Sequence, residues 1–426
     1  MPFLPEYSWE FLSKDEIEYR TLRAMRNHVS YLKEKSGYYA KRLEFAEPDD
    51  IKNIEDILLL PFTQKEELCA NTNAFYCSAN IVETCVTSGS TGHPLVVGLT
   101  NADLDRLTYN EAMSFNSIGI NSQDRAQVMV SLDRLFIAGM AYYRGLIALG
   151  VNTTRIGVLS PEFQEYYIRL LRPTVLVGVP SYFIKLAESL KATGKDIRAS
   201  SVNKLICIGE PLRREDMSLS DVAKKIEALY NAEVFSTYAS TETCSSFCDC
   251  AHRTGGHSHP ELIYTEILDE AGNPVADGEV GEIVVSTFGM EGMPLLRYRT
   301  GDMTFKVPGN CPCGRNSMRI GPIIYRKSQL IKVKGTTIYP ATITNVVDSL
   351  GCCEDYIVEV KGNKNDDNHT DIALHVIADK KELNKITQAI LNVARVRVSV
   401  FLSNKGTISL LRGDARKAIR FVDKRK

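Results

Sequence analysis

The chain has 426 residues, of which 44% are hydrophobic and 24% charged, with a formal net charge of −1 at pH 7. This composition is typical of a globular protein of about two to four domains, and the near-neutral charge argues against nucleic acid or an anionic membrane as the main partner. The first residues lack the features of a signal peptide and no apolar run is long enough for a membrane span, so we expect a cytoplasmic protein.

The eleven cysteines are an odd number, which in a reducing compartment indicates free thiols or metal ligands rather than disulfides. The first expected element is a helix that begins at a capping box formed by Ser13 and Glu16. From about residue 125 the pattern alternates, with strands expected at 128–130, 173–180, 205–209 and 234–238 and helices around 183–190 and 222–230. Strands and helices in this alternation predict an α/β fold with a parallel, doubly wound sheet covered on both faces.

Residues 263–320 show short strands and turns, which predicts a β-rich subdomain. The last part of the chain predicts a small α+β domain, with strands at 356–360, 372–377 and 396–402, a helix at 382–393 and a polar loop at 362–370. We therefore expect a large N-terminal domain of residues 1–325 and a small C-terminal domain of residues 326–426.

A loop of hydroxyl residues and glycines, Ser88-Gly89-Ser90-Thr91-Gly92-His93-Pro94, is the most informative segment of the chain. Glycine allows the backbone to approach a ligand closely, and successive backbone N–H groups can surround a phosphate. The loop is not of the GxxxxGK[ST] kind, because no Lys-Ser/Thr pair follows the glycines. Taken alone, it is equally typical of an ordinary turn between two strands.

Further segments follow this loop in a fixed order. They are Tyr238-Ala239-Ser240-Thr241-Glu242, Tyr298-Arg299-Thr300-Gly301-Asp302, Arg326 with residues 331–335, and Lys417 within residues 416–420. The ordered set resembles the adenylate-forming superfamily of acyl-CoA ligases, peptide-synthetase adenylation domains and luciferases. Residues 173–182 (PTVLVGVPSY), 295–302 (LLRYRTGD) and 311–315 (CPCGR) look like the phenylacetate–CoA ligase branch of that superfamily.

The resemblance implies ATP-dependent activation of a carboxylic acid to an acyl-adenylate, followed by transfer to coenzyme A. It implies an N-terminal domain that binds ATP and the acid, and a mobile C-terminal lid that swings about residues 326–328. The implied ATP-binding residues are Thr87, Ser88, Gly89, Ser90, Thr91, Gly92, Gly209, Glu210, Pro211, Tyr238, Thr241, Asp302 and Arg326.

Each implied role has a chemical reason. Tyr238 would stack on adenine, and Asp302 would accept hydrogen bonds from the ribose hydroxyls with Arg326 nearby. Glu242 would ligate Mg²⁺, and Lys417 would balance the charge that builds on the α-phosphate. The position of residues 209–211 at the end of a parallel strand is where such a fold binds ligands.

The acid itself is not defined by the sequence. Phe136, Tyr142 and Tyr143 lie where the branch places its acyl pocket, and aromatic side chains there would suit an aryl or arylalkyl acid. Core packing explains these residues equally well. The partners implied are the acid, ATP and CoA, and relatives suggest a homodimer.

Departures from the family pattern keep two other functions open. His93 stands where the loop usually carries lysine, Ala239 and Arg416 replace glycines, and Ser328 replaces an acidic hinge residue. One alternative is adenylation with a different acceptor, such as a carrier protein, an amine or a cofactor. The other is a nucleotide-binding protein that has lost catalysis.

A metal site is also expected. The turn Cys311-Pro312-Cys313-Gly314 directs two thiolates to one point, and six further cysteines and histidines lie upstream: Cys244, Cys248, Cys250, His252, His257 and His259. Three thiolates and an imidazole suit a closed, tetrahedral structural Zn²⁺ site. The branch resemblance selects Cys250, His257, Cys311 and Cys313 as ligands; the alternative is a set of buried thiols with no metal.

Overall fold

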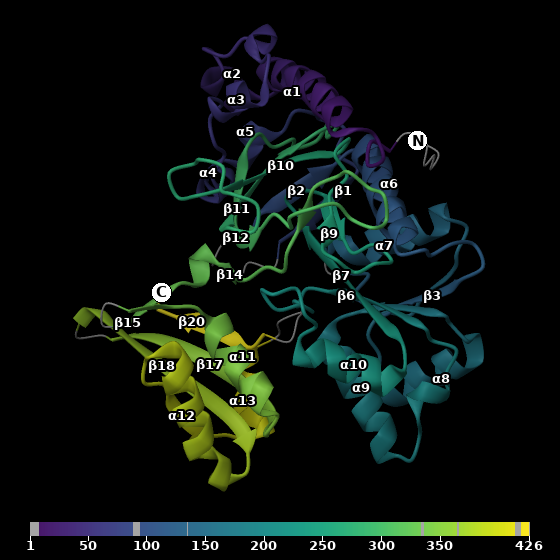
Figure 1. The fold of residues 1–426 in the computed structure, drawn as a ribbon, viewed down its shortest axis with the longest axis vertical. Coiled ribbons are helices and arrows are strands. Elements are labelled where there is room, and N and C mark those ends of the chain that lie inside the picture. The colour runs from purple at the N-terminus through teal and green to yellow at the C-terminus, as the bar shows by residue number, and fades with distance from the viewer. Residues whose placement is uncertain are drawn as a thin grey trace. The chain divides into compact units, whose positions relative to one another are not determined.

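The computed structural model describes residues 8–87, 94–133, 135–333, 336–363, 366–413 and 419–425 (Figure 1). The chain divides into two compact units, one of Met1–Thr300 with Thr304–Pro322 and one of Gly301–Met303 with Ile323–Lys426. The expected boundary between residues 325 and 326 falls just inside the second unit. No helix of the described residues combines the length and the apolar character needed to cross a membrane.

The first unit holds most of the chain. Its helices are α1 (Lys14–Lys35), α2 (Gly37–Arg42), α3 (Ile54–Leu58), α4 (Lys65–Ala70), α5 (Thr72–Phe75), α6 (Asn101–Ser117), α7 (Ile137–Ala148), α8 (Pro161–Leu171), α9 (Pro180–Ala192) and α10 (Asp221–Tyr230). Its strands are β1 (Glu83–Val86), β2 (Val96–Leu99), β3 (Arg125–Val128), β4 (Asn152–Arg155), β5 (Val175–Gly178), β6 (Lys204–Ile208), β7 (Glu233–Ser240), β8 (Ser245–Cys248), β9 (Gly256–His257), β10 (Ile263–Leu268), β11 (Val280–Thr287) and β13 (Arg319–Ile320). β12 (Tyr298–Phe305) contributes residues to both units.

The central sheet of the first unit has the strand order β13-β9-β8-β7-β6-β5-β3-β4. The half from β7 to β4 is parallel, which confirms the predicted doubly wound sheet. β8, β9 and β13 extend it in antiparallel pairings that the sequence pattern does not reveal, because these strands are only two to four residues long. β4 and β5 lie on opposite sides of β3, so the order in which strands are added to the sheet reverses between β3 and β5. Open sheets of this type bind ligands at such a point.

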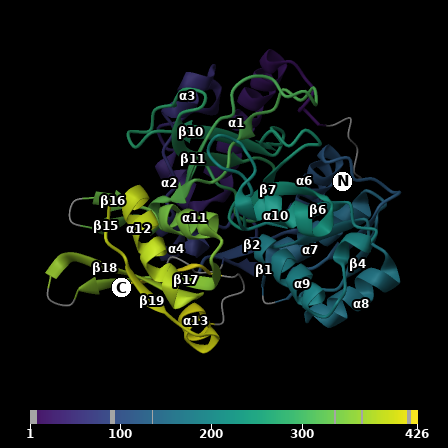
Figure 2. The ribbon, with the colours of Figure 1, turned by 60° about the horizontal axis from the view of Figure 1, so that its bottom comes forward.

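Alternate residues of the parallel strands face opposite sides of the sheet. Leu176 and Leu205 pack with buried residues of α8, α9 and α10, whereas Val177 and Ile206 pack with buried residues of α6 and α7. Figures 1 and 2 show α9 and α10 side by side along one face. Both faces are therefore covered, as the continuous apolar strands predict.

Helix α1 begins where the sequence predicts, since the backbone N–H of Glu16 donates to the Ser13 side chain at 3.2 Å. The carboxylate of Glu16 binds Arg20 at 2.7 Å, so the reciprocal half of the predicted capping box is replaced by an i,i+4 ion pair. The expected strand at 128–130 is displaced, because β3 starts earlier, at Arg125. The polar residues Arg125 and Gln127 precede the apolar run 128–130, so that run coincides with only the last residue of the strand.

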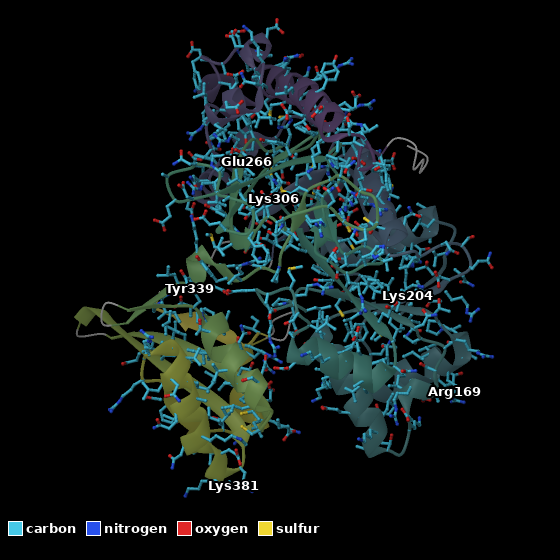
Figure 3. The ribbon with its side chains drawn as sticks, in the orientation of Figure 1. Arg169, Lys204, Glu266, Lys306, Tyr339 and Lys381 are labelled. Carbon is cyan, nitrogen blue, oxygen red and sulfur yellow. The ribbon has the colours of Figure 1, made fainter. Side chains whose placement is uncertain are left out.

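The remaining sheets are smaller. β1 and β2 form an antiparallel pair, and β10, β11, β12 and β14 (Tyr325–Arg326) form an antiparallel sheet in the expected β-rich region. Glu266 of β10, labelled in Figure 3, forms a buried ion pair with Arg297 at 2.9 Å. This pair joins β10 to the segment that leads into β12.

The second unit is the expected α+β domain. Its further elements are β15 (Ile331–Val333), β16 (Thr336–Ile338), α11 (Pro340–Leu350), β17 (Cys353–Asn363), β18 (Asp366–Ala378), α12 (Leu383–Ala394), β19 (Ser399–Leu402), α13 (Lys405–Arg412) and β20 (Phe421–Lys424). The sheet order is β19-β18-β17-β20, and α11 and α12 pack their buried residues on it. The predicted polar loop at 362–370 is wrong, because β17 extends to Asn363, β18 begins at Asp366, and the two strands pair Gly362 with Thr370. Its polar composition does not prevent backbone pairing between two long antiparallel strands.

Candidate active site and metal centre

The carboxyl ends of β6 and β7 bring two of the predicted nucleotide-binding segments together. Ile208 and Thr237 are paired partners in the parallel ladder, so Gly209 and Tyr238 follow at neighbouring strand ends. Gly209 has a φ of +77°, a conformation that glycine adopts without strain, and it turns the chain sharply after β6. The ring of half-buried Tyr238 lies 5.8 Å from that of Phe247 on β8, tilted by 40°.

Glu210 is held in place by the start of α9. Its Oε1 accepts a hydrogen bond from the Ser181 hydroxyl at 2.7 Å, and its Oε2 accepts one from the Ser181 backbone N–H at 3.2 Å. The carboxylate thus joins the end of β6 to the helix that follows β5. Pro211 comes next in the chain and is exposed.

Glu242 lies at the end of β7 and is only 7% exposed. Its Oε1 is 3.0 Å from the Nζ of Lys65 on α4 and 3.5 Å from the hydroxyl of Tyr298 on β12. The neighbouring Thr241 uses its carbonyl oxygen to accept a hydrogen bond from the Cys244 thiol at 3.2 Å. Lys65 is a residue that the sequence analysis missed, because 177 positions separate it from Glu242 and no local motif connects them.

Several predicted residues cannot be placed. Ser88, Gly89, Ser90, Thr91, Gly92 and His93, and likewise Arg416 and Lys417, lie outside the described residues. Thr87, at the start of the loop, is described and buried. Its hydroxyl accepts a hydrogen bond from the Leu95 backbone at 2.9 Å, and its N–H donates to the Leu95 carbonyl at 3.0 Å. The two ends of the loop are therefore fixed to each other beside β1 and β2.

Asp302 and Arg326 meet within the second unit, where β12 and β14 pair them directly. The Oδ1 of Asp302 is 2.5 Å from the Arg326 Nε, and Oδ2 accepts a hydrogen bond from Nη2 at 3.2 Å. Asp302 is buried, whereas 43% of the Arg326 side chain is exposed. The guanidinium thus orients both oxygens of the carboxylate that is predicted to bind ribose.

The three predicted acyl-pocket residues have different surroundings. Tyr142 is buried in the core between the sheet and α6, with its ring 5.9 Å from Phe115, and burial raises its pKa well above the ordinary value. Phe136 is partly buried against the same core. The ring of half-buried Tyr143 lies 4.6 Å below the guanidinium of Arg155. Core packing therefore accounts for Tyr142.

The metal centre assembles four donors from separate segments. Donor atoms of Cys250, His257, Cys311 and Cys313 all lie within 4.8 Å of one another. The two sulfurs of Cys250 and Cys311 are 3.6 Å apart, and the Cys313 sulfur is 3.5 Å from the His257 Nε2. Tetrahedral Zn²⁺ with Zn–S bonds of about 2.3 Å places its sulfur ligands roughly 3.8 Å apart. The donor set and its spacing therefore fit Zn²⁺.

The surroundings of the cluster orient its histidine. His257 Nδ1 is 3.1 Å from the Ser317 hydroxyl, so Nε2 faces the cysteines, the arrangement expected around a metal-bound imidazole. Burial lowers the pKa of His257 to about 4, which keeps the ring neutral at pH 7. A neutral imidazole is the form that binds a metal.

Neighbouring candidates are engaged elsewhere. Both ring nitrogens of His259 are taken, by the Glu10 carboxylate at 3.2 Å and by the Ser114 hydroxyl at 2.9 Å. Cys248 packs in the core against the sheet, and Cys244 binds the Thr241 carbonyl. The structure thus brings together the four residues that the resemblance selects.

Comparison with known proteins identifies the class of the chain. The model of the AMP-binding enzyme family matches residues 43–292, more than half of the chain. The chain belongs to the AMP-binding enzyme family.

Among curated proteins, the chain is similar to several enzymes of one name. Phenylacetate-coenzyme A ligase of Thermus thermophilus is 29% identical over 359 residues, which cover 82% of this chain and 78% of that protein. The enzymes of the same name from Pseudomonas putida and Escherichia coli are 27% and 26% identical, and the matches cover 77% and 76% of their lengths.

Solved structures share the fold. 2-Hydroxyisobutyryl-CoA ligase, in the postadenylation state in complex with 2-HIB-AMP, superposes with a TM-score of 0.85 and 21% identity, covering 98% of this chain and 91% of that one. ATP-bound MatB from Rhodopseudomonas palustris has a TM-score of 0.59 and 18% identity, covering 81% and 67%. At these identities the similarity establishes the fold alone.

Proposed function

We propose that this protein is an AMP-forming acid–CoA ligase. In the first half-reaction a carboxylate attacks the α-phosphorus of ATP, giving an acyl-adenylate and pyrophosphate. In the second, the thiol of coenzyme A attacks the acyl carbon, giving a thioester and AMP. The observation that carries the proposal is the combination of family membership with curated phenylacetate-coenzyme A ligases that align over most of both chains.

The predicted nucleotide-binding and catalytic residues have roles in this proposal that follow from their chemistry. Tyr238 presents an aromatic face for adenine, and Asp302, oriented by Arg326, accepts hydrogen bonds from ribose. Glu242 supplies a carboxylate for Mg²⁺, which would neutralise phosphate charge when bound. Lys417 is proposed to stabilise the charge that develops on the α-phosphate.

The loop of residues 88–92, together with Thr87, is proposed to surround the phosphates with backbone N–H and hydroxyl groups. Glu210, through its two bonds to Ser181, fixes the turn beside the adenine position. Gly209 keeps that turn narrow. These groups bind and orient ATP, and none of them needs to gain or lose a proton.

The metal centre is proposed to hold structural Zn²⁺ through Cys250, His257, Cys311 and Cys313. A closed set of four protein ligands leaves no position for substrate, so its role is to join the segments that carry its ligands. A cytoplasmic location and a homodimer belong to the same proposal.

The substrate is proposed to be an aryl or arylalkyl acid, because the curated relatives are named for phenylacetate. An acceptor other than CoA is the second candidate, since His93, Ala239, Ser328 and Arg416 depart from the family pattern. The two functions share the first half-reaction and differ in the second.

The decisive experiment measures ATP–pyrophosphate exchange with a panel of aryl, arylalkyl, hydroxy and fatty acids, followed by AMP formation with and without CoA. Exchange with phenylacetate and CoA-dependent AMP release are the expected results. Exchange without CoA consumption would favour the second candidate. Nucleotide binding without exchange for any acid would indicate a chain that has lost catalysis.

A further inference from the structure

The segment that carries Lys65 is fixed to the strand β12. The Thr63 N–H donates to the Arg297 carbonyl at 3.1 Å, and the Arg299 N–H donates to the Thr63 carbonyl at 3.0 Å. The guanidinium groups of Arg297 and Arg299 both lie over the Phe62 ring, at 4.1 and 4.9 Å from its centroid. The backbone just before Lys65 is therefore fixed to the segment that carries Tyr298, and both Lys65 and Tyr298 contact Glu242.

The ammonium of Lys65 and the carboxylate of Glu242 form an ion pair with no net charge. The side chains of Lys65 and Glu242 are 25% and 10% exposed, so water screens their interaction only partly. Both contacts that the described residues make with this carboxylate use Oε1. A metal ion bound through Oε2 would place two cations beside one carboxylate, and this excess of positive charge favours an anion nearby.

We propose that Lys65 is a phosphate-binding residue of the adenylation reaction, a role that rests on the proposed function. In the nucleotide-free protein its ammonium neutralises Glu242. When Mg²⁺ and ATP bind, the metal takes over the charge of Glu242 and the ammonium moves to a phosphate oxygen. Four methylene groups give the lysine side chain the freedom to exchange one partner for the other while its backbone stays fixed.

If Lys65 exchanges Glu242 for a phosphate oxygen, removal of its positive charge should weaken nucleotide binding and strengthen Mg²⁺ binding. Lys65→Met deletes a phosphate contact, so nucleotide affinity should fall about 10- to 150-fold, the range for a lost hydrogen bond to a charged group. The same change removes the ammonium that competes with the metal for Glu242. The Mg²⁺ concentration that gives half of the maximal binding should therefore decrease, whereas a merely structural role would raise it or leave it unchanged.

Isothermal titration calorimetry with α,β-methylene ATP, at a series of Mg²⁺ concentrations, measures both effects without turnover. Lys65→Arg should keep most of the affinity. In the Glu242→Gln background, Lys65→Met should no longer lower the Mg²⁺ requirement. The matched control is Lys195→Met, which breaks a lysine–glutamate pair of 2.7 Å with Glu165 at an exposed site and should change neither quantity.

A second measurement uses the unaltered protein, so that a misfolded variant cannot obscure the answer. Lysine acetylation by acetic anhydride, read by mass spectrometry, should decrease at least fivefold at Lys65 when Mg²⁺ and α,β-methylene ATP are added together, and should stay constant at Lys195. An unchanged reactivity of Lys65 would overturn the inference, as would unchanged affinity in Lys65→Met. Binding of the analogue without acid-dependent exchange would instead refute the proposed function, and the acetylation result would still decide the role of Lys65.

Discussion

The first unit contains two polar clusters of opposite character. At the end of β7, Glu242 and Lys65 form a single ion pair that water partly reaches. In the proposed metal centre, Cys250, His257 and Cys311 are buried, and the donor atoms of the cluster lie within 4.8 Å of one another. A pair that is partly exposed can exchange partners at low cost, whereas a buried donor set without its metal leaves polar groups in a place where water cannot compensate them.

The second cluster is also tied to the start of the chain. Arg315, which follows the CPCG turn, donates to Glu10 at 3.0 Å, and the Asn316 N–H donates to the Glu10 carbonyl at 2.6 Å. Glu10 is fully buried and its pKa is lowered: burial raises it, but the interactions with His259 and Arg315 outweigh this effect. We therefore propose that the Glu242–Lys65 pair serves chemistry and that the metal centre serves stability.

The largest effect is expected from removing a ligand of the metal centre. Cys311→Ser should abolish binding of one zinc per chain and destabilise the first unit by on the order of 5 kcal/mol or more, because metal binding contributes directly to folding. Zinc content by atomic absorption and the thermal unfolding midpoint measure both effects. The matched control is Cys69→Ser, which changes a half-buried cysteine outside the centre and should keep the zinc.

Chelation of the wild-type protein should produce the same destabilisation as Cys311→Ser. A protein that contains no zinc after expression in zinc-supplemented medium, and unfolds at the same temperature with and without chelator, would contradict the structural metal. Adenylation measured per folded molecule should change little, because the centre offers no open coordination position.

Glu242→Gln should lower activity and leave zinc content unchanged, which is the opposite of the result expected for Cys311→Ser. Loss of the carboxylate that we propose binds Mg²⁺ is expected to reduce acid-dependent ATP–pyrophosphate exchange about 10²- to 10³-fold, equivalent to about 3–4 kcal/mol of transition-state stabilisation. Zinc content should stay at the wild-type level. Exchange within threefold of wild type at saturating Mg²⁺ would exclude Glu242 as a metal ligand, and loss of zinc would show that the two clusters are not independent.

Glu111 on α6 provides a carboxyl group that is buried like the metal centre and forms no ion pair with the residues that the structure describes. Burial raises its pKa from 4.5 to about 7. Between these values the folded protein binds a proton that the unfolded chain has released, so stability falls as the pH rises from 4.5 to 7 and is then constant. Glu111→Gln stays neutral and should be more stable than wild type by about 3 kcal/mol at pH 8, with little difference at pH 4.

Urea unfolding of both proteins from pH 4 to pH 8 measures this difference. Parallel stability profiles would show that Glu111 is ionised in the folded protein near its ordinary pKa. The buried position on α6 would then need a compensating charge, in the way that Lys65 compensates Glu242.

Much of the fold could be predicted because its signals are local. The apolar strands at 173–180 and 205–209 indicate burial on both faces, and the structure has β5 and β6 there with helices on each side. The CPCG turn and the histidine upstream are compact motifs, and the structure brings their donors together. In both cases the prediction depends on residues that are close together in the sequence.

The rest depends on contacts between distant segments. Lys65 lies next to Glu242 because the neighbouring Thr63 pairs with the residues around Tyr298. No sequence periodicity connects the segments that carry Lys65, Glu242 and Tyr298. The strands β9 and β13 are two residues long and exist through their partners. The length of β17 and β18 could not be predicted from their polar ends, because pairing of backbone groups does not require apolar side chains.

The smallest effect is expected from Ser13→Ala, which removes the N-cap of α1 and touches neither cluster. Its hydroxyl accepts one hydrogen bond from the Glu16 N–H at 3.2 Å at an exposed helix end, so the loss should be about 1 kcal/mol. Urea unfolding should record it, while zinc content and exchange activity stay at wild-type values. Because α1 belongs to the unit that holds both clusters, this variant shows how far a modest loss of stability alone disturbs them. If exchange activity fell as far in Ser13→Ala as in Glu242→Gln, the effect at Glu242 would reflect stability rather than chemistry, and the contrast between the clusters would fail.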